Sequence, residues 1–259
     1  MAKLRGIVPY FGGKSALATR LIDRIEAVPH ACYAEPFVGG GGVILRRQRP
    51  AKIEAVNDIS GDIVTTFRVA QRHPAALVAE LRFGIAARAE FERLLKVDPN
   101  TLTDIERAAR FISLQGYRYG AKPTSNSFSP GPRAVRARSI TEMRRHLITV
   151  SRRLQRVVIE RLDFEAFIGR YDTAETLFYL DPPYWGIEKA YGPGFARGDF
   201  ERLSNCLRNI SGRFIMSLND RPGVRDVFRW AQIEEIATTY HVAGGGCQPT
   251  TELLISTPA

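Results

Sequence analysis

Two hydrophobic patterns alternate along this chain. Short apolar runs predict buried strands at residues 31–34, 53–56, 157–160, 176–180 and 213–218. Segments with apolar side chains at helical spacing separate most of these runs, and the first carries Leu17, Leu21 and Ile25. Two further strands, at 234–241 and 252–256, enclose a glycine run and predict a closing antiparallel hairpin. Strands that alternate with helices predict an α/β fold built on a doubly wound sheet.

The pattern changes between residues 61 and 149. Helical periodicity dominates there, and no strand-like run interrupts it. Residues 120–138 are rich in Ser, Pro and Gly and are predicted to form a loop. We therefore predict a small, mainly helical domain at 61–149, inserted into a discontinuous α/β domain formed by residues 1–60 and 150–259. The helices expected in the insertion lie at 63–72, 74–83, 90–95, 104–119 and 140–154.

The charge of the chain indicates a polyanionic partner. Its 259 residues carry a formal net charge of +10, with a pI of about 9.8, which favours nucleic acid as the partner. A generically basic soluble protein is the alternative. Arginines and lysines are concentrated in and after the predicted loop, and aromatic residues lie among them. A surface that contacts phosphates and bases needs both kinds of side chain. A solvated basic helix face beside a flexible loop is the competing interpretation. The residues predicted to contact DNA are Tyr117, Arg118, Tyr119, Lys122, Arg133, Arg136 and Arg138.

Several classes of protein are disfavoured. No apolar run approaches the ~20 residues that a membrane span needs, and no signal peptide is recognisable at the N-terminus. Cys32, Cys206 and Cys247 form no C-x-x-C pair, so we expect neither a zinc site nor a disulfide framework. We expect a monomer in the cytoplasm of a bacterial or phage-infected cell, with no metal and no membrane partner.

Two glycine-rich turns are candidates for ligand binding. Residues 12–15 read Gly-Gly-Lys-Ser, but the first glycine of a nucleoside-triphosphate loop is replaced by Val8, so we reject that site. The second turn follows a predicted strand, contains glycines at 39–42, and precedes a helix expected from Ile44. Strand, glycine loop and helix are typical of the nucleotide-binding half of a doubly wound sheet. Ile44 replaces the third glycine of the dinucleotide fingerprint, and a merely flexible turn is the alternative.

An acidic residue follows the next strand. Asp58 is placed to accept hydrogen bonds from ribose hydroxyls, as an acid after a glycine loop does in nucleotide-binding folds. It could instead cap the helix that begins near Ile59. The glycine loop favours the ribose role.

The turn Asp181-Pro182-Pro183-Tyr184 is the strongest candidate for chemistry. It ends the apolar strand at 176–180, and neither proline can donate a backbone N–H. The Asp181 carboxylate and the Pro182 carbonyl can both accept from an exocyclic amine, while the Tyr184 ring can stack on a planar base. A turn that merely ends the strand is the alternative.

Together, these motifs resemble the N6-adenine-specific DNA methyltransferases of the DNA adenine methylase type, with features of phage or prophage members. The resemblance covers most of the chain. It implies an α/β, Rossmann-like seven-stranded methyltransferase sheet with an inserted helical DNA-recognition domain, S-adenosyl-L-methionine as cofactor and double-stranded DNA as partner. The motifs that carry it are residues 10–14, 35–41, 57–58, 163–164, 181–184 and 252–255.

The resemblance also assigns site residues. Asp181 and Pro182 would hold the amine of an extrahelical adenine on which Tyr184 stacks, and direct in-line attack on the methyl group would follow. The catalytic set is Asp181, Pro182, Pro183 and Tyr184. The cofactor-binding set is Tyr10, Gly12, Lys14, Glu35, Pro36, Phe37, Gly39, Gly41, Asp58, Asp163, Phe164 and Asp181.

The resemblance does not identify the residues that read the bases, because residues 116–123 differ from the corresponding stretch of the best-known family members. The target sequence therefore stays open. Methylation of cytosine N4 or of RNA adenine is the nearest alternative activity. A catalytically silent nucleic-acid-binding module and a nicotinamide-dependent oxidoreductase are alternatives from other classes.

Overall fold

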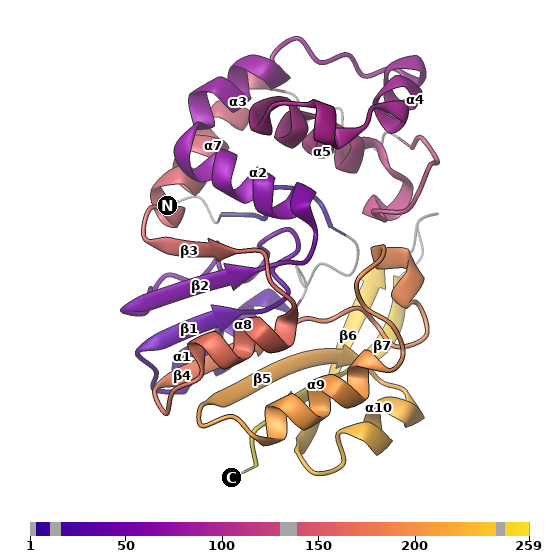
Figure 1. Cartoon of the computed structure of the whole chain (residues 1–259). Coiled ribbons are helices and arrows are strands. Elements are labelled where there is room, and N and C mark those ends of the chain that lie inside the picture. Colours follow the sequence, from indigo (N-terminus) through magenta and orange to yellow (C-terminus); the bar gives the residue numbers. More distant parts are fainter. Residues whose placement is uncertain (1–3, 11–16, 130–138, 242–246, 259) are drawn as a thin grey trace.

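A computed structural model describes residues 4–10, 17–129, 139–241 and 247–258. Its centre is a seven-stranded sheet with the order β3-β2-β1-β4-β5-β7-β6 (Figure 1). The first five strands in that order are parallel, and β7 pairs antiparallel with both β5 and β6. The predicted α/β class and closing antiparallel pair are confirmed. The strands are β1 Cys32–Glu35, β2 Ile53–Asn57, β3 Val157–Glu160, β4 Thr176–Leu180, β5 Arg213–Asn219, β6 Gln232–His241 and β7 Cys247–Ser256.

The central strands β1, β2, β4 and β5 are buried on both faces of the sheet, to which their successive side chains point in turn. One side contributes Tyr33, Leu177, Tyr179, Ile215 and Leu254 to the core beneath α1 (Ala18–Ala27). The other side contributes Ala34, Phe178, Leu180, Met216 and Leu253 to a second core. This second core is covered by α8 (Phe164–Tyr171), α9 (Asp199–Arg208) and α10 (Pro222–Val227), which lie in front of the sheet in Figure 1.

The segment between β2 and β3 is helical, as predicted. The helices α2 and α5 pack on each other, and α3 packs against both α5 and α7 (Figure 1). Side chains from α2, α5 and α7 also belong to the same hydrophobic core as the α1 side of the sheet. The division of the chain into two domains stays a prediction. Among the described residues of this segment, the α-helices are α2 Gly61–Arg72, α3 Pro74–Leu81, α4 Arg88–Lys96, α5 Asp104–Tyr117 and α7 Ile140–Leu154.

The prediction of a helix that begins at Ile44 is wrong. Residues 39–46 form consecutive turns, with hydrogen bonds such as Arg46 N to Val43 O at 2.9 Å. Only five residues separate Ile44 from Pro50, a residue that ends helical backbone, so the expected helix had little room to form. Gly39 and Gly41, which precede this segment, have left-handed φ values of 49° and 76°. The loop after β1 is thus held by its own turn geometry.

Candidate active site

The sheet has a topological switch point between β1 and β4. The chain continues from β1 outwards to β2 and β3 on one side, and from β4 to β5 on the other. All five of these strands are parallel, so their carboxyl ends lie at one edge of the sheet. In open α/β sheets, ligands bind outside the carboxyl ends at such a point. The glycine loop, Asp58 and the Asp181–Tyr184 turn follow β1, β2 and β4 respectively, which brings the main sequence-predicted motifs to this edge.

The glycine loop has no room for side chains at its apex. A Cβ added at Gly39 would lie 3.2 Å from the Tyr10 ring, and one added at Gly40 would lie 2.7 Å from the carbonyl oxygen of Val8. The N-terminal segment thus packs directly on the loop, with Ile7 N donating to Gly40 O at 2.9 Å. Close approach of backbone to a ligand is a use to which proteins put glycine.

The carboxylate of Asp58 is bound by two backbone groups. Its Oδ2 accepts from Gly39 N at 3.1 Å and its Oδ1 from Ser60 N at 2.9 Å. Burial raises the pKa of Asp58 to about 6, although these two hydrogen bonds act in the opposite direction. Ser60, not Asp58, is the N-cap residue of α2. Asp58 therefore joins the ends of β1 and β2, and each oxygen keeps further lone-pair capacity for a ligand hydroxyl.

The side chain of Asn57 links three strand ends. Its Nδ2 donates to the carbonyls of Pro36 and Leu162, both at 3.0 Å, and its Oδ1 accepts from Leu162 N at 2.7 Å. Asn57 is almost fully buried. The sequence indicated only that an Asn-Asp pair ends the strand, whereas the structure makes Asn57 the residue that sets the spacing of the β1, β2 and β3 ends.

Three phenylalanines lie together beside this edge. The ring centroids of Phe37 and Phe164 are 5.6 Å apart, and Phe195 lies 5.7 Å from Phe37 and 5.9 Å from Phe164. Arg202 lies over the Phe164 ring at 4.2 Å and pairs with the Asp163 carboxylate. Asp163 also caps α8 by accepting from Glu165 N at 3.0 Å. Phe195 was noted in the sequence only as one aromatic residue of a loop.

Glu35 ends β1 with a buried carboxyl group. Burial raises its pKa to about 8, and nearby Asp181 adds to the rise. The hydroxyl of Tyr33, which donates to Glu35 at 2.7 Å, and the guanidinium of Arg47 oppose it. Arg47 itself is buried over the Tyr33 ring at 3.8 Å and pairs with Glu54 at 3.1 Å. Glu35 is thus the inner end of a polar network beneath the switch point.

The turn after β4 crosses the neighbouring strand ends. The Tyr184 hydroxyl donates to Glu252 Oε1 on β7 at 2.5 Å. The side-chain amide of Asn219, the last residue of β5, binds both backbone groups of Trp185. Pro182 and Tyr184 are buried, whereas Asp181 and Pro183 are partly exposed. The sequence offered no role for Asn219 or Glu252 beyond their places in motifs.

Tyr10 marks where these parts meet. Burial raises the pKa of Tyr10 well above its ordinary value. The charges of Asp58 and Asp181 and the hydroxyl of Tyr191 raise it further, whereas Arg118 lowers it. Such interactions require proximity. The end of β2, the turn after β4, the following loop and the residue after α5 therefore all lie near Tyr10.

The loop at 185–198 contacts both halves of this site. The ring of Tyr191 lies 6.3 Å from that of Tyr184, and Phe195 joins the Phe37 cluster. The carbonyl of Ala190 accepts from the hydroxyl of Thr124 at 3.2 Å, which connects the loop to the segment after α5.

The four predicted DNA-contact residues that the structure describes differ in their placement. Tyr117 is 2% exposed and packs on Phe128, so its ring contributes to the interior and does not fit the predicted DNA contact. Arg118 binds the carbonyl of Ser125 at 3.1 Å and orders its own segment. Tyr119 is 44% exposed, and Lys122 is partly exposed. The predictions at Gly12, Lys14, Arg133, Arg136 and Arg138 lie outside the described residues.

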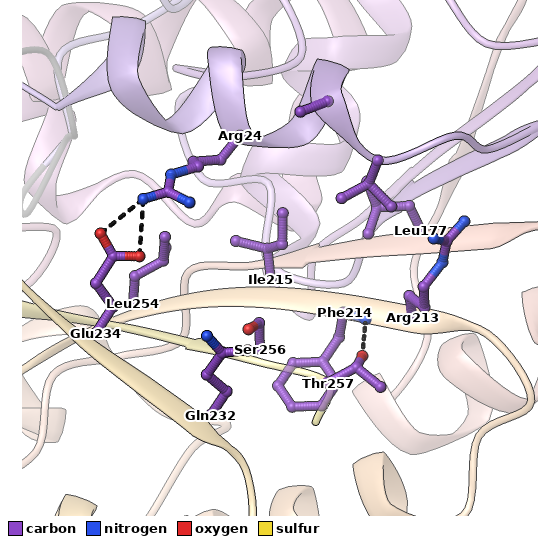
Figure 2. A pocket seen from close by; sticks show the side chains of 12 residues that line it. Arg24, Leu177, Arg213, Phe214, Ile215, Gln232, Glu234, Leu254, Ser256 and Thr257 are labelled. Atoms are coloured by element: carbon purple, nitrogen blue, oxygen red, sulfur yellow. Dashed lines mark hydrogen bonds and ion pairs between the residues drawn. The ribbon is translucent and has the colours of Figure 1, made fainter. Parts of the chain in front are cut away.

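A separate hollow of about 230 Å³ lies at the opposite edge of the sheet (Figure 2). It is lined by the first residues of β4 and β5 and by Ser256 at the end of β7. Arg24 is bound there to Glu234 at 2.7 Å. None of the predicted site residues lines it. In the ranges that the structure describes, no cluster of His, Cys, Asp and Glu could hold a metal ion, and no helix combines the length and apolarity of a membrane span.

Comparison with known proteins identifies similar chains. A family model described as D12 class N6 adenine-specific DNA methyltransferase matches residues 10–242. Type II methyltransferase M.MjaIII of Methanocaldococcus jannaschii is 30% identical over 207 residues, which cover 70% of each chain. Type II methyltransferase M.CviBI of Paramecium bursaria Chlorella virus NC1A is 21% identical over 235 residues, which cover 87% of this chain and 86% of the viral protein.

The crystal structure of precorrin 8W decarboxylase from Methanobacterium thermoautotrophicum aligns with 99% of this chain and 100% of its own. The TM-score is 0.43 and the sequence identity 11%. A likeness of this size supports no conclusion about function.

Proposed function

Since the chain belongs to the D12 class of N6 adenine-specific DNA methyltransferases, we propose that it methylates the N6 amine of an adenine rotated out of the duplex. The resemblance inferred from the sequence is confirmed at the level of the family, and the protein is an adenine-specific DNA methyltransferase. Rotation of the base and the roles of individual residues belong to the proposal.

The residues at the switch point suit S-adenosyl-L-methionine, which methyltransferases use in general. The positive φ values at Gly39 and Gly41 and the close packing of Tyr10 leave a loop whose backbone a ligand can approach. The Asp58 carboxylate has lone pairs left for ribose hydroxyls. Phe37 and Phe164 offer apolar rings for an adenine, with Phe195 as a cover. When bound, the cofactor would supply an electrophilic methyl group.

The observation that carries the proposal is the position of the Asp181–Tyr184 turn. It lies at the end of β4, beside the glycine loop of β1, and Tyr10 interacts with the ends of both β2 and β4. A base held there would be adjacent to a cofactor held over the glycine loop. Positioning of two reactants at adjacent sites can supply much of the acceleration of a group transfer.

The chain's own groups would act on the amine and the ring. The adenine N6 lone pair is delocalised into the ring, which makes the amine a weak nucleophile. Hydrogen bonds from the amine to Asp181 and to the Pro182 carbonyl would favour a pyramidal nitrogen and stabilise the positive charge that develops on it. Tyr184 would hold the ring by stacking, which is worth about 1–3 kcal/mol per base.

The DNA would lie across the segment after α5 and the 185–198 loop. Tyr119 and Lys122 are the exposed or partly exposed members of the predicted contact set in this part of the structure. The net charge of +10 supports a large contribution from phosphate contacts, which position a duplex but carry no sequence information.

A transfer assay with labelled S-adenosylmethionine on unmethylated genomic DNA tests this proposal. The DNA is digested to nucleosides, and N6-methyladenine is the expected product. Asp181→Ala should abolish transfer while cofactor binding, measured by calorimetry, persists. Asp226→Ala, an exposed acid on α10, is the matched control and should leave transfer unchanged. N4-methylcytosine, or product on RNA alone, would replace the proposed substrate.

A further inference from the structure

A buried carboxylate interrupts the apolar strand β7. Glu252 is 2% exposed, and the three residues that follow it, Leu253 to Ile255, are all buried and apolar. Its Oε1 accepts a hydrogen bond from the Tyr184 hydroxyl at 2.5 Å. A charged group in such surroundings costs free energy unless it is specifically paired, so core packing alone does not account for a glutamate at this position.

Glu252 acts together with the residue beside it in the sheet. Asn219 of β5 is paired in register with Glu252 of β7. Asn219 Oδ1 accepts from Trp185 N at 2.9 Å, and its Nδ2 donates to Trp185 O at 3.0 Å. Two adjacent strand residues thus hold two consecutive residues of the turn, Tyr184 by its side chain and Trp185 by its backbone.

The Trp185 ring adds a steric constraint. A Cβ added at Gly223 would lie 2.1 Å from this ring, which therefore occupies space that only glycine leaves open. The ring also packs on Phe200 at 4.8 Å. The backbone after Tyr184 is thus held on both sides, while the Tyr184 side chain is bound at its hydroxyl by Glu252.

We infer that Glu252 is a positioning residue, whose carboxylate holds the Tyr184 ring at the angle that receives an extrahelical adenine. The inference rests on the proposed function and deepens it. The hydrogen bond to Glu252 is made at the Tyr184 hydroxyl, so it does not itself cover either face of the ring. Donation of a hydrogen bond to an anion also increases the electron density of the phenol ring, which strengthens its attraction for the positive charge that develops on a methylated base.

A double-mutant cycle tests this role. The variants are Glu252→Ala, Tyr184→Phe and the combination, each measured for kcat/KM and for 2-aminopurine fluorescence in a duplex that carries the probe at the target position. Glu252→Ala should lower kcat/KM about 10- to 100-fold, the range expected for loss of a hydrogen bond to a charged group. In the Tyr184→Phe background the same substitution should cost less than about threefold, because its partner is already gone.

Two further variants separate positioning from stability. Glu252→Gln keeps a neutral acceptor and should restore part of the activity and of the fluorescence signal. Glu235→Ala changes a surface glutamate on β6, opposite Leu253 and bound to Arg225, and should leave both unchanged. Thermal melting and cofactor calorimetry confirm that each variant is folded.

The outcomes decide the inference and the proposed function separately. An equal loss of kcat/KM from Glu252→Ala in the wild-type and Tyr184→Phe backgrounds would overturn the inference, because Glu252 would then act independently of Tyr184. Wild-type protein that makes no N6-methyladenine, but whose 2-aminopurine signal depends on both residues, would reject the proposed reaction and retain the positioning role. Wild-type protein that makes no N6-methyladenine, and whose 2-aminopurine signal depends on neither Glu252 nor Tyr184, would reject both the proposed reaction and the positioning role.

Discussion

The side-chain amide of Asn219 binds both sides of the Trp185 residue, with Oδ1 2.9 Å from its N–H nitrogen and Nδ2 3.0 Å from its carbonyl oxygen. Asn219→Asp keeps the acceptor but replaces the donor with an oxygen that repels the Trp185 carbonyl. We expect kcat to fall about 10- to 100-fold, because small displacements at a catalytic turn have effects of this size. Single-turnover methylation measures the change. Asn205→Asp, exposed on α9, is the control and should have no effect.

The raised pKa of Glu35 predicts a pH-dependent stability. A folded-state pKa of about 8 exceeds the ordinary value, so the protonated form favours folding. This contribution is fully present below the unfolded-state pKa and is lost as pH rises through about 8. Glu35→Gln should therefore raise stability at pH 9 relative to wild type, by on the order of a few kcal/mol, and change it little at pH 4. Urea unfolding at both pH values measures the difference; equal effects at the two would contradict the expected titration.

The carboxyl of Asp58 predicts a pH-dependent cofactor affinity. With a pKa of about 6, it loses its negative charge as pH falls below that value. We expect S-adenosylmethionine to bind about tenfold more weakly at pH 5 than at pH 7.5, since one unit below the pKa leaves about a tenth of the carboxyl ionised. Calorimetry across this range measures the affinity. Asp58→Asn should bind weakly at every pH, and a variant with the wild-type profile would exclude Asp58 as the titrating group.

The position of Phe195 predicts that the 185–198 loop contributes to cofactor binding. Its ring lies 5.7 Å from Phe37 and 5.9 Å from Phe164, the rings proposed to hold the cofactor's adenine. Phe195→Ala should weaken cofactor binding about three- to tenfold, the range that aromatic pair energies give. Phe83→Ala is the control, because that side chain is 77% exposed. Equal affinities for the wild type and Phe195→Ala would remove the loop from the cofactor site.

We predict that Lys122, in the segment after α5, contacts a DNA phosphate. Lys122→Ala should weaken binding of all DNA sequences to a similar degree and reduce the slope of log K against log salt by about 1. Lys52→Ala is the control, because Lys52 precedes β2 and lies away from the strand ends that carry the site. Fluorescence anisotropy between 50 and 200 mM salt is the measurement. A slope that Lys122→Ala leaves at the wild-type value would place the duplex elsewhere.

Local patterns in the sequence were sufficient for most strands and for the positions of the motifs. The strand predicted at 176–180 has the observed bounds of β4, since a parallel strand buried on both faces is an unbroken apolar run. The turn at Asp181 and the acid after β2 were placed at strand ends for the same reason. The expected helix at Ile44 did not form: the segment before Pro50 is short, and residues 39–46 form consecutive turns.

The sequence alone could not distinguish exposed from buried residues in the basic, aromatic segment that contains Tyr117 and Tyr119. Tyr117 and Tyr119 are two residues apart and of the same type, yet one is buried on Phe128 and the other is exposed. Their difference depends on where α5 ends and on the return of the chain at Phe128, which pairs with Arg118. A composition argument gives both residues the same role.

The sequence by itself determined the fold class, the order of the motifs and the chemical groups available to the site, because these follow from local periodicity and residue type. Only the tertiary structure decided which residues support those groups. Glu252 is 68 positions from Tyr184, Asn219 is 34 from Trp185, and Leu162 is 105 from Asn57. Their contacts depend on strand order, with β7 placed antiparallel beside β5, and no short-range pattern in a single chain contains that information.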